Sequence, residues 1–96
     1  MINGCFENPQ VEKWQIFENG VEGWSGEGIE IGKGKFYNNR WPKPNKDQVA
    51  EMDGKQNVEM SQTVALKQGQ YSLSLKCAAR KGQDLGTSQL EILWNG

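Results

Sequence analysis

A polar loop near the middle of the chain carries the side chains best suited to contact a sugar. They are Tyr37, Asn38, Asn39, Arg40 and Trp41. Aromatic rings stack on sugar rings, while amide and guanidinium groups hydrogen-bond to sugar hydroxyls. Two prolines within residues 37–46 restrict the backbone there, so this loop is expected to keep its shape. The pattern predicts a ligand-binding loop, although Trp41 could equally fold back to cover one end of a small domain.

Most catalytic chemistry is excluded by the composition. The chain has no histidine, which removes Ser-His-Asp triads, Cys-His pairs and imidazole zinc ligands. Glycoside hydrolysis by two carboxylates needs no histidine, but it needs a deep cleft that holds them about 5 to 9 Å apart. A domain of 96 residues rarely forms such a cleft. The sequence therefore predicts a protein that is not an enzyme.

The two cysteines, Cys5 and Cys77, form no CxxC motif, so a zinc ribbon and a thioredoxin-type site are both excluded. Cys77 falls on the inward phase of an alternating segment, whereas Cys5 has the opposite parity to Phe6, the residue expected to point inward. Two separate thiols are therefore favoured over a disulfide bond.

Charge and hydropathy exclude two classes of partner. Eleven basic and twelve acidic residues leave a net charge of −1, which gives no electrostatic reason to bind nucleic acid. No run approaches the roughly 18 consecutive apolar residues of a membrane span. The length and the apolar content fit one small globular domain over residues 1–96.

Two segments near the end of the chain alternate between apolar and polar residues with the period of a β-strand, residues 70–78 and 88–94. Their inward residues would be Tyr71, Leu73, Leu75 and Cys77 in the first segment, and Leu90, Ile92 and Trp94 in the second. Residues 58–66 alternate less strictly and are joined to residues 70–78 by a connection of hairpin length. The pattern predicts adjacent antiparallel strands.

Earlier segments are shorter. Residues 48–52 are predicted to form a strand, and residues 29–36 a weaker one that two glycines loosen. Residues 11–17 could form one short turn of helix, and residues 8–28 and 37–46 are predicted to be long loops. Several short strands separated by turns favour an all-β antiparallel sandwich or jelly roll.

Six short motifs resemble, in their order, the galactose-binding-like β-jelly rolls. They are Asn3-Gly4-Cys5-Phe6-Glu7, Gly23-Trp24, Ala50-Glu51-Met52-Asp53-Gly54, Met60-Ser61-Gln62-Thr63-Val64, Gly69-Gln70-Tyr71-Ser72-Leu73-Ser74 and Ala78-Ala79-Arg80. The chain is most similar to carbohydrate-binding-type domains of plant cell-wall and bacterial exported proteins. The resemblance covers about residues 3 to 95.

The resemblance implies an exported or cell-surface sandwich of eight or nine strands that binds glycans or acts in adhesion. It also implies a structural calcium ion, for which Glu7 matches the glutamate ligand, although Glu7 could instead be an exposed carboxylate. The aspartate that the family supplies from its last strand has no counterpart, because the sequence stops where relatives continue. We therefore expect the N-terminal portion of a jelly roll. Either the sequence is a fragment of a longer chain, or another chain or self-association completes the half-sandwich.

Two functions follow from these expectations. The first is a non-catalytic carbohydrate-binding or adhesion module that uses residues 37–41. The second is a structural or protein-interaction subunit that binds no sugar. A row of outward polar residues offers a further glycan-binding face, or is only a solvated sheet face. Its members are Glu59, Ser61, Ser72, Ser74, Lys76, Gln89 and Glu91.

Overall fold

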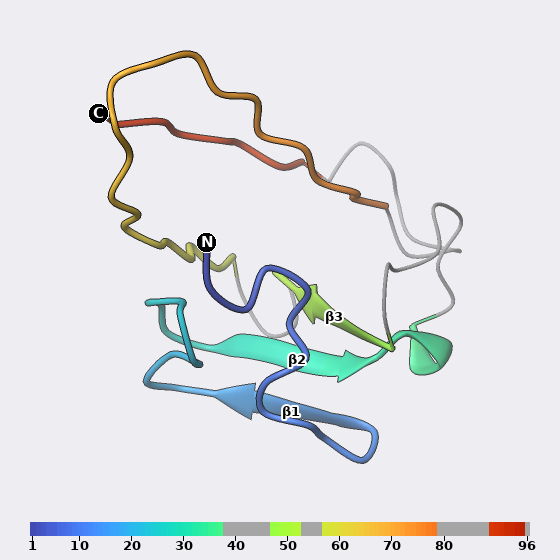
Figure 1. Cartoon of the computed structure of the whole chain (residues 1–96). Coiled ribbons are helices and arrows are strands. Elements are labelled where there is room, and N and C mark those ends of the chain that lie inside the picture. The colour runs from blue at the N-terminus through green and yellow to red at the C-terminus, as the bar shows by residue number, and fades with distance from the viewer. Residues whose placement is uncertain (38–46, 53–56, 79–88, 96) are drawn as a thin grey trace.

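The computed structural model describes residues 1–37, 47–52, 57–78 and 89–95. Three strands form one antiparallel sheet in the order β1-β2-β3 (Figure 1). The strands are β1 (Trp14–Phe17), β2 (Ile29–Lys33) and β3 (Gln48–Glu51). A single 3₁₀ turn, η1 (Gly34–Phe36), follows β2. The described part of the chain is therefore all-β, as expected, and none of its helices is long and apolar enough to cross a membrane.

Strand β2 is the centre of the fold because it pairs with a neighbour along both edges. Ile29 and Ile31 are fully buried, and Val11 joins them in the core. Partly buried apolar residues pack against this core, namely Phe6, Phe17, Val21, Trp24, Ala50, Val58 and Met60. The ring centroids of Phe6 and Trp24 lie 5.5 Å apart, so the N-terminal segment closes one side of the core.

The predicted strand over residues 29–36 is shorter in the structure. Strand β2 ends at Lys33, and the Tyr37 amide then donates to the Gly34 carbonyl at 3.0 Å, which makes the turn η1. The predicted strand over residues 48–52 is confirmed by β3, apart from its last residue.

The suggested turn of helix at residues 11–17 is wrong, and the predicted loop over residues 8–28 contains a strand. Trp14 lies opposite Gly32 in the β1–β2 register, and the Lys33 amide donates to the Lys13 carbonyl at 2.7 Å. Pairing with the central strand satisfies backbone groups that a single helical turn would leave without partners.

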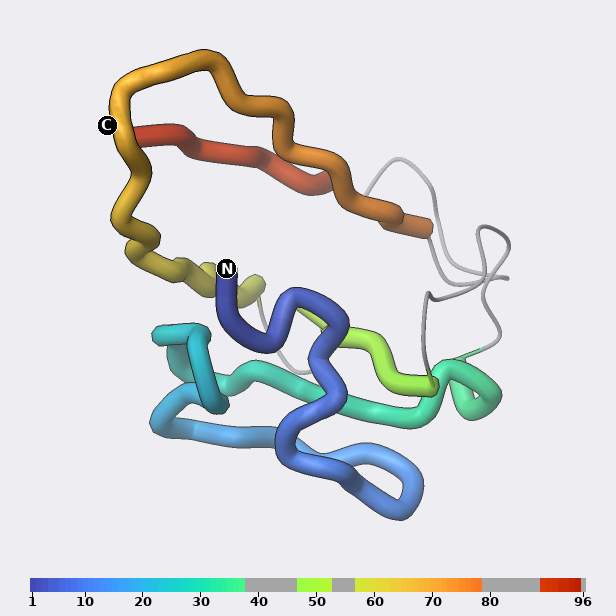
Figure 2. Tube along the Cα trace, viewed as in Figure 1, coloured from blue at the N-terminus to red at the C-terminus, as the bar shows by residue number. Residues whose placement is uncertain are grey.

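The three predicted strands over residues 58–66, 70–78 and 88–94 join no sheet among the described residues. One isolated bridge links Ser61 to Ser25. Figures 1 and 2 show that the chain instead leaves the sheet region, bends at residues 68 and 69 and turns back. We refer to residues 62–78 and 89–95 as the arm.

The arm exposes the residues that alternation placed in a core. Its large apolar side chains are 44 to 67% exposed, and Trp94, expected in the core, is 61% exposed. Alternation specifies which face of a segment is apolar, but it does not specify what covers that face. Within the described residues, the β-sheet is therefore a small three-stranded one.

Candidate functional site

Tyr37 is the only residue of the predicted sugar-binding loop within the described part of the chain, and the structure buries it. Its side chain is 4% exposed, and its hydroxyl donates to the Glu30 Oε2 at 2.7 Å. The ring lies so close to Gly32 that any Cβ at position 32 would collide with it. A buried ring offers no face to a sugar, so Tyr37 supports the sheet in this structure rather than a stacking site.

The other four residues of that loop, Asn38, Asn39, Arg40 and Trp41, lie outside the described residues. A sugar-binding role for them stays a prediction.

Glu7, the predicted calcium ligand, ties the N-terminal segment to β3. Its Oε1 accepts a hydrogen bond from the Gln48 amide at 3.0 Å, and its Oε2 accepts one from the Gln10 Nε2 at 2.9 Å. Desolvation raises the pKa of Glu7, but favourable interactions outweigh it and the pKa is lowered overall. These come from the Gln48 backbone, the Gln10 side chain, the Lys33 charge and the Asp47 backbone.

Gln48 is the centre of this arrangement and is almost fully buried. Its Nε2 donates to the Phe6 carbonyl at 2.6 Å and to the Pro9 carbonyl at 3.0 Å. Its Oε1 accepts from the Val11 amide at 2.8 Å. One side chain thus satisfies three backbone groups of the N-terminal segment, a buried network that sequence patterning did not reveal.

The same contacts bear on the predicted calcium site. Carbonyl and carboxylate oxygens near Glu7 are the ligands that calcium prefers, but here they accept hydrogen bonds from amide groups. No group of three or more acidic, cysteine or histidine residues converges anywhere in the described ranges. Calcium binding by Glu7 stays a prediction.

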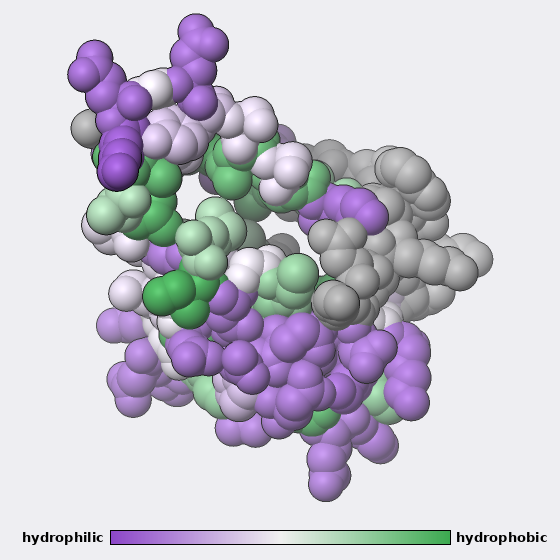
Figure 3. All heavy atoms as spheres, viewed as in Figure 1, coloured by the Kyte–Doolittle hydropathy of each residue, from purple (hydrophilic) through white to green (hydrophobic). Residues whose placement is uncertain are grey.

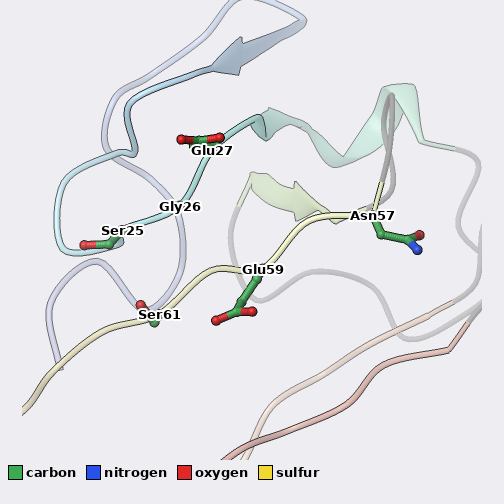
Figure 4. A pocket seen from close by; sticks show the side chains of 6 residues that line it. All are labelled: Ser25, Gly26, Glu27, Asn57, Glu59 and Ser61. Carbon is green, nitrogen blue, oxygen red and sulfur yellow. The ribbon is translucent and has the colours of Figure 1, made fainter.

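A shallow polar pocket lies between two facing segments on the arm side of the sheet (Figure 4). Its volume is about 410 Å³, and its lining residues are Ser25, Gly26, Glu27, Asn57, Glu59 and Ser61. The five side chains other than glycine make no hydrogen bond or ion pair with any described residue. The pocket therefore presents carboxylates, hydroxyls and an amide that are free to contact a ligand.

Backbone pairing builds this pocket. Ser25 and Ser61 exchange hydrogen bonds of 2.8 and 2.9 Å, which fixes the two segments side by side. Gly26 permits the close approach, because a Cβ there would lie 2.5 Å from the Glu59 carbonyl oxygen. Glu59 and Ser61 belong to the outward polar row noted in the sequence. Residues 25–27 were missed because their contact with residues 57–61 is distant in sequence.

The third candidate is the apolar surface of the arm. Figure 3 shows apolar side chains along the arm, bordering a hollow between it and the rest of the molecule. The exposed residues are Leu66, Tyr71, Leu73, Leu75, Leu90, Ile92, Leu93 and Trp94. Exposed apolar patches of this kind are common at interaction surfaces, which makes this surface a candidate site.

Both cysteines are free and exposed thiols. Cys77 shares the parity of Leu73 and Leu75 in the arm, whereas Cys5 lies in the N-terminal segment. The two thiols therefore lie in different parts of the molecule, one in the arm and one in the N-terminal segment.

Comparison with known proteins gives no match, since no family model, no curated protein and no solved structure is similar to this chain at a significant level. The resemblance to galactose-binding-like jelly rolls therefore rests on the six sequence motifs alone.

Proposed function

We propose that this chain is a non-catalytic structural or protein-interaction subunit whose half-sandwich is completed by another polypeptide chain. The observation that carries the proposal is the exposed apolar face of the arm. Tyr71, Leu73 and Leu75 follow one another on a single face, and each is about half exposed.

The physical reason is the cost of leaving this face in water. Covering a half-exposed leucine or isoleucine contributes about 1 kcal/mol, so an uncovered row of them forfeits several times that amount. The backbone of residues 70–78 and 90–95 also makes no hydrogen bond to any described residue, and extended backbone of this kind can pair with a strand of another chain. Another polypeptide could cover the apolar face by packing a layer against it, and could pair with the unbonded backbone along the side of the arm.

A photo-reactive amino acid at neighbouring positions of the arm tests the proposal. In cells that make the protein, the group at position 75 should form an adduct with one defined polypeptide, identified by its peptides. The matched control is position 76, where the native residue is Lys76 on the opposite face. Equal adducts from both positions, or no polypeptide adduct from either, would overturn the proposal.

Carbohydrate binding is the second candidate, and the polar pocket favours it. Carboxylates and amides such as Glu27, Glu59 and Asn57 are the groups that hydrogen-bond to sugar hydroxyls, and none has a partner among the described residues. The pocket lining includes no aromatic residue, so a stacking ring would have to come from outside it, for example from Trp41.

Titration of the chain with a panel of soluble polysaccharides tests this candidate. Saturable binding that is lost in Glu59→Gln and in Trp41→Ala would support it. Binding by no member of the panel, or binding that both variants leave unchanged, would exclude this site as a glycan site.

A further inference from the structure

We infer that the polypeptide covering the arm is a second copy of this chain, related to the first by a two-fold axis. This inference rests on the proposed function, because it names the partner of the same apolar face. Three features of the arm favour a second copy: the size of its face, its free backbone groups and its charges.

The size of the apolar face matches one half of a stable dimer interface. Seven large side chains of the arm fall on the apolar phases of the alternation and are 44 to 61% exposed, namely Leu66, Tyr71, Leu73, Leu75, Leu90, Ile92 and Trp94. With about 100 Å² exposed on each, they present on the order of 700 Å², close to what one partner contributes to a standard interface. Symmetric contact buries the same face on both copies, so one mode of association covers all of it.

Much of the backbone of the arm makes no hydrogen bond to the described residues. Residues 70–78 and 90–95 make no backbone hydrogen bond to any described residue. Their donors and acceptors can therefore form a ladder between copies. Identical segments that pair antiparallel about a two-fold axis satisfy one edge of each copy in one closed interface, whereas a head-to-tail contact would continue into fibres.

The distribution of charge is compatible with association between two copies of the chain. The apolar row of the arm carries no ionic group, so its partner must present an uncharged face as well. The charged residues of the arm are Lys67, Lys76 and Glu91, on an overall net charge of −1. Two copies therefore repel each other only weakly, and the charged side chains Lys76 and Glu91 alternate with the apolar row and so lie off the shared face. The arm combines an uncharged apolar row with extended backbone that makes no hydrogen bond to any described residue over residues 70–78 and 90–95.

The first measurement is the solution mass of the full chain by light scattering over a series of concentrations. We expect twice the 10.8 kDa of one chain at high concentration, and dissociation on dilution. Leu73→Glu places a charge on the apolar face of both copies and should weaken the dimer by roughly 100-fold or more. The matched control Ser74→Glu adds the same charge on the opposite face and should leave the mass unchanged.

The second measurement does not depend on a substitution that could prevent folding. Cys77 and Cys5 are both exposed in the single chain, so both should react quickly with a thiol reagent at low concentration. As the concentration rises, Cys77 should become protected by the second copy. Cys5 lies off the arm and serves as the internal control.

The outcomes separate this inference from the proposed function. A dimer with concentration-dependent protection of Cys77 supports both. A monomer in which Cys77 reacts as fast as Cys5 at every concentration overturns the second copy, while the open face and its need for another partner remain. A monomer in which Cys77 is always protected shows that the chain covers its own face and overturns both. Open-ended oligomers overturn the two-fold pair.

Discussion

Gln48 is the single side chain on which the N-terminal segment depends. Gln48→Leu keeps a similar volume but leaves the Val11 amide and the Phe6 and Pro9 carbonyls without partners. Buried groups without partners cost about 1 to 3 kcal/mol each, so we expect the free energy of unfolding to fall by about 3 kcal/mol. Urea denaturation followed by tryptophan fluorescence measures the change.

The control for this substitution is Gln15→Leu in strand β1, since Gln15 is exposed and its side chain bonds to no described residue. It should alter the free energy of unfolding by no more than about 0.5 kcal/mol. If both substitutions cost the same, the hydrogen bonds of Gln48 do not hold the segment.

Glu7 makes stability depend on pH. Its pKa is lowered in the folded chain from the ordinary value of 4.5. The folded state therefore binds the Glu7 proton less readily than the unfolded state does. The stabilisation is complete above the unfolded value and is lost as the pH falls through the folded pKa.

Urea midpoints measured from about pH 6 to about pH 3 should fall more steeply for the native chain than for Glu7→Gln. Glu12→Gln is the matched control, since Glu12 is exposed and bonds to no described residue, and it should follow the native curve. Parallel curves for the native chain and Glu7→Gln would show that the hydrogen bonds and charges around Glu7 do not stabilise its ionised form in the folded chain.

Strand β2 accommodates the Tyr37 ring because position 32 has no side chain. In Gly32→Ala the new Cβ would collide with that ring, so either the ring or the strand must move. We expect a loss of about 1 to 3 kcal/mol in the free energy of unfolding, measured by urea denaturation. Gly69→Ala is the control, because a Cβ there meets only the Tyr71 ring at 3.8 Å or more. A neutral Gly32→Ala would mean that Tyr37 does not pack on β2.

The elements that the sequence predicts best are those whose pattern and pairing agree. Strand β2 alternates at Ile29, Glu30 and Ile31, strand β3 is a short segment between predicted turns, and the two strands pair with each other in the sheet. Strand β1 was missed because Val11, Trp14 and Phe17 are spaced three apart, as on a helix, and only pairing with β2 overrides that spacing. Local pattern alone could not anticipate a distant partner.

Function was harder to predict than strands, for the same reason. Tyr37 has the residue type of a sugar-binding aromatic, but Gly32 has no side chain and so leaves room for the Tyr37 ring to pack on β2. The polar pocket depends on the β-bridge between Ser25 and Ser61, and no short sequence motif predicts this bridge. The apolar row of the arm was predicted to be the buried side of strands, but its residues are exposed, because alternation does not specify what covers a face.

At the scale of the whole molecule, the sheet and the arm differ in how far their apolar side chains are buried. The core around Ile29 and Ile31 is fully buried in one chain, whereas Leu73 and Leu75 remain about half exposed. Cooperative protection requires buried contacts, so the two regions should open with different free energies. If a second copy covers the arm, only the arm should respond to protein concentration.

Hydrogen exchange at two concentrations tests this division. In dilute solution, the amides of residues 73–75 should exchange almost as fast as in an unfolded peptide, since they have no backbone partner among the described residues. The amides of β2 should exchange slowly, because that strand is paired along both edges. Raising the concentration tenfold stabilises a dimer by about 1.4 kcal/mol. Exchange in the arm should therefore slow by up to tenfold, while exchange in β2 through local opening stays constant.

Two results would contradict this division. Strong protection of the arm in dilute monomer would mean that one chain closes its own sandwich. Equal slowing in both regions would mean that the sheet and the arm fold only as a unit.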